Sequence, residues 1–124
     1  MGEKYVQFDL EDRTYEFARR CRDFTKIISK IQANIEYGKQ LIRSSGSTAA
    51  NYIEANEAIS DKDFIFRIRI CRKEVKESRL WLKLSDPGEE ERVQSEQVFL
   101  IGEATELLKI FTAIINKKSE SKKD

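Results

Sequence analysis

The sequence is poor in residues that interrupt helices, and it lacks histidine altogether. Among 124 residues there are one proline, five glycines and no histidine, while 36% of the residues are charged. Few helix breakers and abundant charge favour long helices over a turn-rich β fold. The absence of histidine removes the commonest general base and a common metal ligand. A chain of this length can bury one hydrophobic core, so we expect a single all-α domain over residues 1–124.

Signals for targeting or membrane insertion are also missing. No apolar run reaches the ~18–20 residues that a membrane-spanning helix requires. The first residues lack the apolar stretch of a secretory signal, and Val6 stands where the myristoylation motif requires Ser or Thr. Cys21 and Cys71 each fall on an apolar helical stripe, which is typical of core thiols rather than of a disulfide or a ligand pair. We therefore expect a cytoplasmic protein that does not contact a membrane.

Four segments show the spacing of amphipathic helices. Apolar residues recur in each at alternating steps of three and four, as on one face of a helix. The expected helices cover about residues 12–31, 34–58, 61–84 and 89–116, with 1–11 loosely ordered and 117–124 frayed. Because the connections are short, these helices are predicted to form an antiparallel up-down-up-down four-helix bundle.

Capping residues and one break set the expected helix ends. Asp12, Asn34 and Ser60 are interpreted as N-caps, because their side chains can accept hydrogen bonds from the first free N–H groups of a helix. Ser60 is followed by acidic residues that suit the positive helix end. The run Asp86-Pro87-Gly88 is the clearest break and separates the last two helices.

The second segment carries unusually small residues on its buried stripe. The apolar period continues through the Ser- and Gly-rich stretch 44–48, so we expect a helix there rather than a linker. Small side chains let a neighbouring backbone approach closely. The residues expected to allow close helix packing are Gly38, Ser45, Thr48 and Ala55.

Apolar residues exceed what one bundle core needs. A second apolar stripe runs beside the core stripe of the last segment, and large apolar residues flank the core stripe of the third segment. Surplus of this kind predicts association with another subunit. The expected interface residues are Phe66, Ile70, Trp81, Ile101, Leu108 and Ile115.

Three stretches carry a family resemblance. DRTYEFA, YGKQLIRSSGSTAANYIEA and KEVKESRLWLKL resemble the small four-helix-bundle proteins encoded within intervening sequences of bacterial 23S ribosomal RNA genes. The same superfamily includes the accessory variability protein of diversity-generating retroelements. The resemblance covers about residues 12–116 and implies an antiparallel bundle assembled as a ring-like homopentamer. In the retroelement branch it also implies binding of nucleic acid and reverse transcriptase through a basic surface. The sequence looks closer to the ribosomal-gene branch, whose biochemical role is not established.

Residues typical of catalysis do not form a recognisable site. No phosphate-binding glycine motif is present, and the serines of the 44–47 stretch have no imidazole to activate them. The carboxylates are interpreted as solvated groups or as partners of Arg and Lys on neighbouring helices. We therefore predict a protein that is not an enzyme, with no cofactor and no metal.

Two functions remain, and charge distinguishes them. The first is an oligomeric scaffold that binds another protein; the second is a module that binds RNA or DNA through its phosphates. Residues 13–30 and 61–83 each carry a net charge of +4, whereas residues 86–106 total −6. The expected phosphate contacts are Arg19, Arg20, Arg22, Lys26, Arg67, Arg69, Arg72, Lys73, Lys76 and Arg79. A continuous positive surface favours nucleic acid, and interleaved ion pairs favour the scaffold.

Overall fold

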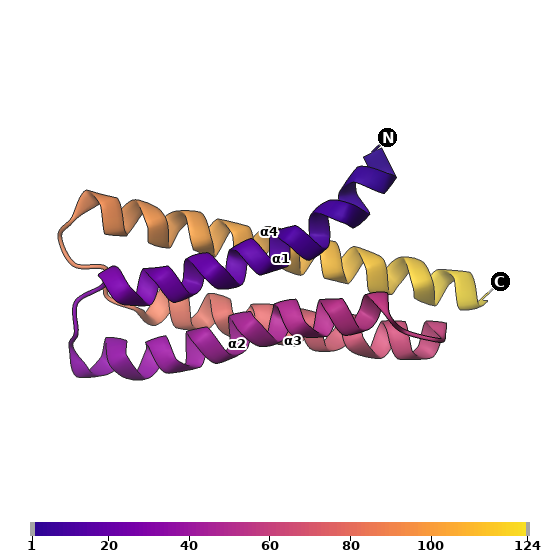
Figure 1. The fold of residues 1–124 in the computed structure, drawn as a ribbon, viewed down its shortest axis with the longest axis horizontal. Helices are drawn as coiled ribbons and strands as arrows, with labels where there is room; N and C mark the ends of the chain where they lie inside the picture. Colours follow the sequence, from indigo (N-terminus) through magenta and orange to yellow (C-terminus); the bar gives the residue numbers. More distant parts are fainter. Residues whose placement is uncertain (1, 124) are drawn as a thin grey trace.

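Four helices make up the fold. The computed structural model describes the backbone of residues 2–123 and the side chains of residues 10–119. The helices are α1 (Gly2–Ile27), α2 (Gln32–Asn56), α3 (Asp61–Leu84) and α4 (Glu91–Lys123), and the described chain contains no β-strand. Consecutive helices contact one another and α4 also contacts α1, an arrangement compatible with a bundle (Figure 1). The α1–α2 and α3–α4 connections lie at one end and the α2–α3 connection at the other.

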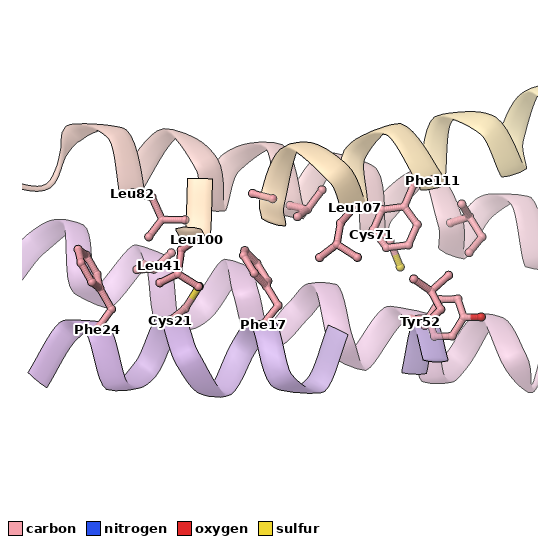
Figure 2. Packing of buried hydrophobic residues seen from close by; sticks show 14 of the residues in the cluster. Phe17, Cys21, Phe24, Leu41, Tyr52, Cys71, Leu82, Leu100, Leu107 and Phe111 are labelled. Carbon is pink, nitrogen blue, oxygen red and sulfur yellow. The ribbon is translucent and has the colours of Figure 1, made fainter. Parts of the chain in front are cut away.

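All four helices contribute to one hydrophobic core. Phe17, Leu41, Leu82 and Phe111 are fully buried or nearly so and come from four different helices (Figure 2). Burial of each such side chain stabilises the fold by about 1.5–3 kcal/mol relative to leaving it in water. The alternating steps of three and four therefore identified most of the buried positions correctly. The predicted helix through the 44–48 stretch is confirmed, because α2 is continuous there.

The ends of α1 differ from the prediction. The helix begins at Gly2, so Asp12 lies inside it and is not an N-cap, and residues 2–11 are helical rather than loosely ordered. Leu10, in the part of α1 that was not predicted to be helical, is buried in the core. This side chain gives the additional N-terminal turns of α1 a contact with the rest of the fold. The helix ends at Ile27, four residues early. Ile31 consequently lies in the connection and is 46% exposed.

Capping explains where α2 and α3 begin. Ser60 caps α3 as predicted, because its hydroxyl accepts a hydrogen bond from the backbone N–H of Asp63 at 3.1 Å. The prediction for Asn34 is wrong: the N-cap position of α2 is Ile31, which provides no side-chain cap. Asn34 is instead buried inside the first turn, where its amide binds backbone groups of two connections. The turn before α4 includes Gly88 with a positive φ of 75°, which suits glycine.

The last helix is longer than predicted. It begins at Glu91 and continues to Lys123, so the expected fraying after residue 116 is wrong for residues 117–123. Lys118 provides a reason, because its ammonium group lies 3.3 Å from the carboxylate of Asp61 and 5.4 Å from the ring centre of Phe64. These contacts with α3 favour helical structure in a segment whose composition alone is too polar to predict it.

One predicted interface residue lies in the core. Ile115 is only 3% exposed, whereas the preceding residue, Ile114, is half-buried. A helix turns once in 3.6 residues, so a strict seven-residue repeat drifts by about 20° per heptad. Measured from buried Phe111, Ile115 is turned by about 40° and Ile114 by about 60° in the other direction, so Ile115 lies nearer the buried face. The prediction of Ile115 as an oligomer contact is therefore wrong.

Candidate nucleic-acid interface

A groove between α3 and α4 is lined by cationic side chains. It has a volume of about 820 Å³, and Leu80, Leu108 and Thr112 contribute to its walls. The cations occupy about a third of the circumference of α3, because steps of one, three and four residues keep them on one face. They are Arg69, Arg72, Lys73, Lys76, Arg79 and Lys83.

Within the part of the chain whose side chains are described, these six cations have no carboxylate partner. Among the side chains of residues 10–119, no carboxylate forms an ion pair with any of them. Arg79 donates a hydrogen bond to the hydroxyl of Thr105 at 3.3 Å, which positions the guanidinium without cancelling its charge. The one acid in the lining, Glu77, pairs with Arg43 of α2 at 3.2 Å. The groove therefore presents a cluster of six cations on one face of α3, with Leu80 and Glu77 also in its lining.

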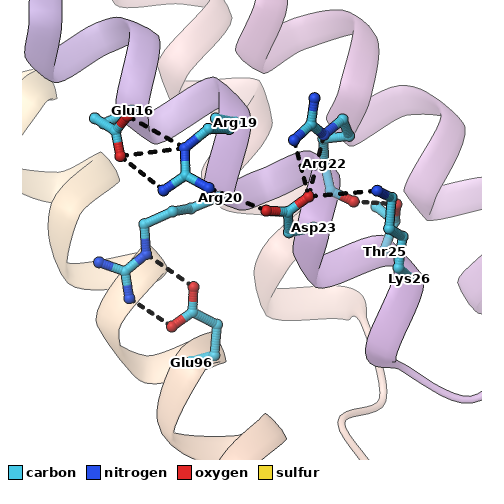
Figure 3. A network of polar contacts seen from close by, with 8 residues as sticks. All are labelled: Glu16, Arg19, Arg20, Arg22, Asp23, Thr25, Lys26 and Glu96. Carbon is cyan, nitrogen blue, oxygen red and sulfur yellow. Dashed lines mark hydrogen bonds and ion pairs between the residues drawn. The ribbon is translucent and has the colours of Figure 1, made fainter.

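The cations of α1 behave in the opposite way. Arg19 lies 2.8 Å from Glu16 and 3.2 Å from Asp23, and Asp23 also pairs with Arg22 and Lys26 (Figure 3). Hydrogen bonding to Arg19 lowers the pKa of Glu16, and hydrogen bonding to Arg22 lowers the pKa of Asp23. Both carboxylates are thus held in their charged form. The α1 surface is a network of interleaved ion pairs, not a free positive face.

Arg20 joins α1 to α4 rather than facing solvent. Its guanidinium donates two hydrogen bonds to the carboxylate of Glu96, at 2.6 and 3.0 Å, and lies 3.8 Å from the ring centre of Phe99. The hydrogen bond to Glu96 raises the pKa of Arg20. A second ion pair, Arg13 with Glu103 at 2.7 Å, joins the same two helices about two helical turns nearer the start of α1. These residues hold the two helices together.

One of the predicted cations of α3 lies outside the groove, and one cation of the groove was not predicted. Arg67 lies on the α2 side of α3, where it donates a hydrogen bond to the side-chain oxygen of Asn51 at 3.0 Å. It is therefore not part of the groove. Lys83 does line the groove. The signal for Lys83 was present in the sequence, since it follows Arg79 by four residues on the same helical face.

The seam between α2 and α3 holds the most polar part of the interior. Ser44 and Ser78 share a buried hydrogen bond of 2.7 Å, and Tyr37 stacks on Trp81 with ring centres 5.9 Å apart. Glu74 is buried, with Arg43 at 3.7 Å. Within residues 10–119, one Glu74 oxygen and the indole N–H of Trp81 have no hydrogen-bond partner. The polar groups of this seam are thus less completely hydrogen-bonded than those in the rest of the described core.

The predicted packing residues and interface residues have different outcomes. Gly38, Ser45, Thr48 and Ala55 are all buried, as expected of positions where helices approach closely. At Gly38 an added Cβ would lie 3.4 Å from the methyl group of Thr25 on α1. Of the proposed oligomer contacts, Phe66 is exposed, Ile70 is half-buried, and Trp81, Ile101 and Leu108 pack against the core. The exposed isoleucines of α2 were not predicted.

The described residues give little evidence for a metal site, a reactive thiol or a membrane-spanning helix. Cys21 and Cys71 are buried free thiols, and no group of three potential metal ligands occurs within the part of the chain that is described. Across the same residues no helix has the length and apolar character needed to cross a membrane.

Comparisons with known proteins identify relatives. The sequence matches the family of 23S rRNA-intervening sequence proteins over residues 7–113. A crystal structure of a protein of unknown function from the S23 ribosomal protein family of Bacteroides thetaiotaomicron is similar, with a TM-score of 0.69 and 30% sequence identity. The likeness covers 85% of this chain and 96% of that one. No curated protein matches the sequence.

Proposed function

Because the chain belongs to the 23S rRNA-intervening sequence protein family, and its structural relative has no known function, we propose a function from its surface. The protein is a non-enzymatic module that binds nucleic acid through the cationic groove between α3 and α4. The observation that carries this proposal is the set of six groove cations without a carboxylate partner among the described side chains. Phosphate groups of RNA or DNA would neutralise these positive charges.

The groove suits a phosphate backbone better than an unpaired base. Its lining residues are cationic, aliphatic or hydroxylic, with a single acid and no aromatic ring. Proteins that hold single strands usually stack bases on aromatic side chains. Contacts in this groove would therefore be mainly electrostatic and largely independent of base sequence.

Assembly would strengthen this contact. The family resemblance implies an antiparallel up-down-up-down bundle that forms a ring-like homopentamer, and we propose that arrangement for this chain. The placement of the connections at alternating ends in Figure 1 supports the antiparallel bundle. Five grooves on one ring would bind the same polymer together, so weak contacts could combine into useful affinity. A cytoplasmic location fits this proposal, because the cell's nucleic acid is accessible there.

A scaffold for another protein is the second candidate. It is favoured by exposed apolar residues on the outward side of α2, including Ile42 at 46% and Ile53 at 50% exposure. Interleaved ion pairs on α1 also fit a surface that does not bind phosphate. This function would use a different face from the α3–α4 groove, so the two can be tested separately.

Charge reversal at matched sites tests nucleic-acid binding. The double variant Arg72→Glu/Lys73→Glu alters the groove, and Arg19→Glu/Arg22→Glu makes the same change in net charge on α1. Binding to fluorescent RNA and DNA at low salt, measured by anisotropy, should weaken by roughly tenfold or more for the groove variant. The α1 variant should bind more like the unaltered protein. Equal loss in both variants, or no binding by the unaltered protein, would contradict the proposed function.

A further inference from the structure

A single acid, Glu77, belongs to the lining of the cationic groove between α3 and α4. Its side chain is 34% exposed. Successive residues of a helix turn by about 100°, which places Glu77 about 40° from Lys73 and about 60° from Glu74 in the other direction. Lys73 lines the groove, whereas Glu74 is buried near Arg43 of α2. Glu77 therefore lies at the edge of the cationic face, between a groove lysine and the side of α3 that packs against α2.

The position of Glu77 brings Lys73 within its reach. Lys73 is exposed and precedes Glu77 by four residues, a spacing at which side chains of opposite charge on a helix can form an ion pair. Such a pair would occupy one cation of the groove and place a carboxylate where a phosphate group would bind. Among the described side chains this pair does not form, because the carboxylate of Glu77 contacts Arg43 instead.

The guanidinium group of Arg43 holds Glu77 as part of a three-point contact. Its Nη2 donates a hydrogen bond to the carboxylate of Glu77 at 3.2 Å. Its Nε donates to the side-chain oxygen of Gln40 at 3.3 Å, and its Nη1 lies 3.7 Å from the carboxylate of Glu74. All three nitrogen atoms of this planar group are thus in use, which fixes its orientation.

The buried carboxylate of Glu74 favours this position of Arg43. Its side chain is 8% exposed, and its Oε2 has no hydrogen-bond partner within residues 10–119. A buried carboxylate is costly unless an opposite charge lies nearby. Arg43 provides that charge, since its Nη1 is the group that lies 3.7 Å from this oxygen. Glu74 therefore keeps Arg43 at the seam between α2 and α3, where Arg43 also reaches Glu77.

We propose that Arg43 is a positioning residue for the cationic groove. It holds Glu77 against α2, so that Lys73 stays available to a phosphate group. This inference rests on the proposed binding of nucleic acid. Arg43 is not among the residues that line the groove, so it acts through Glu77 rather than on the phosphate itself. Without Arg43, Glu77 turns to Lys73 and the groove loses one available cation.

A double-mutant cycle tests this role. Arg43→Gln releases Glu77, Glu77→Gln removes its charge, and the double variant combines the two changes. Binding to fluorescent RNA and DNA is measured by anisotropy at several salt concentrations. Arg43→Gln should weaken binding roughly threefold or more and reduce the salt slope by up to about 0.9, the value for one phosphate contact. In the Glu77→Gln chain, Arg43→Gln should have little effect on either quantity.

Two controls separate this role from simple loss of charge and from loss of stability. Lys39→Gln also removes one positive charge from α2, but Lys39 pairs with Glu36 at 3.4 Å and neither residue lines the groove, so binding should stay unchanged. The cycle is repeated in a Glu74→Gln chain, where loss of Arg43 no longer leaves a buried charge without a partner. Helix content is checked by circular dichroism in every variant.

The outcomes distinguish this inference from the proposed function. If the unaltered protein binds and Arg43→Gln binds equally well, the role of Arg43 is overturned and the proposed function stands. An equal loss from Arg43→Gln with and without Glu77→Gln would overturn the role as well, because Arg43 would then act through its own charge. No binding by the unaltered protein would overturn both the role of Arg43 and the proposed function.

Discussion

The side chain of Asn34 holds the backbone of Asp86 by two hydrogen bonds. Its amide nitrogen donates to the carbonyl oxygen of Asp86 at 2.9 Å, and its oxygen accepts from the backbone N–H of Asp86 at 2.9 Å. The same nitrogen donates to the carbonyl oxygen of Ser29 at 3.0 Å. Asn34 is 3% exposed. One buried amide therefore joins the α1–α2 connection to the α3–α4 connection at the same end of the fold.

Replacing Asn34 with Ala should destabilise the fold strongly. The change removes three hydrogen bonds and the buried amide of Asn34, so the backbone groups of Ser29 and Asp86 lose these partners. We expect the free energy of unfolding to fall by about 2–4 kcal/mol. Urea denaturation measures this loss. Asn56→Ala is the control, because exposed Asn56 makes one side-chain hydrogen bond, to Glu11 at 3.1 Å. Similar small losses for both variants would contradict the role of Asn34.

Gly38 should accept Ala but not Leu. A Cβ at this position would lie 3.4 Å from the methyl group of Thr25, an ordinary contact distance. Gly38→Ala should therefore keep or raise stability, by up to about 1 kcal/mol from helix propensity. Gly38→Leu would force α1 and α2 apart and should cost about 1–3 kcal/mol. Thermal unfolding of the two variants measures the difference. If Ala and Leu destabilised the fold equally, α1 and α2 would have to lie closer together at Gly38 than the structure shows, which would contradict this prediction.

The buried thiols should make the fold less stable at alkaline pH. Burial raises the pKa of Cys71 from 9.0 to about 12 and also raises the pKa of Cys21. Above pH 9 the unfolded chain loses thiol protons that the folded chain keeps. The free energy of unfolding should then fall by up to about 1.4 kcal/mol per pH unit for each thiol, and no such fall should occur below that range.

Cys71→Ala tests the origin of this pH dependence. Urea denaturation at pH 8 and pH 10 should show a smaller loss for the variant than for the unaltered protein. Burial also raises the pKa of Tyr52, which adds a loss of the same sign at higher pH in both proteins. In the folded state at pH 8, neither thiol should react with a thiol reagent. Rapid labelling without unfolding would contradict their burial.

The Arg20–Glu96 pair should contribute to the contact between α1 and α4. The two hydrogen bonds are parallel and the guanidinium also lies on Phe99, so the geometry is better than that of an average surface pair. A double-mutant cycle with Arg20→Met and Glu96→Gln should give a coupling energy of about 0.5–2 kcal/mol. The exposed pair Lys109–Glu106 is the comparison and should give less. Equal coupling in the two pairs would contradict the structural role.

The helical period predicted the core well because burial imposes it directly. Phe17, Leu41, Val75 and Leu100 are buried, and each lies on an apolar stripe with steps of three and four residues. The period could not predict tertiary contacts between distant segments. The burial of Asn34 depends on Asp86, which is far along the chain, so the local interpretation of Asn34 as a cap was reasonable but wrong. The same applies to Lys118, whose contacts with α3 hold the last turns of α4.

The candidate interface was predicted only in part, for a similar reason. Sequence gives the number of cations on a helix, but their charges are available to a ligand only if no carboxylate lies near them. The cations of α1 and α3 looked alike, with a net charge of +4 in each segment. The structure separates them, because the cations of the first group form ion pairs with Glu16, Asp23 and Glu96, whereas no described carboxylate pairs with the groove cations of α3. Such pairs depend on side-chain positions across turns and between helices.

The salt dependence of nucleic-acid binding tests the central claim most directly. The logarithm of the binding constant should fall linearly with the logarithm of salt concentration, with a slope of about −0.9 for each phosphate contact. Removing two groove cations with Arg72→Ala/Lys76→Ala should reduce the slope by about 2, whereas Arg19→Ala/Arg22→Ala should leave it nearly unchanged. An unchanged slope in the groove variant, or an equal reduction in both variants, would contradict phosphate binding in the α3–α4 groove.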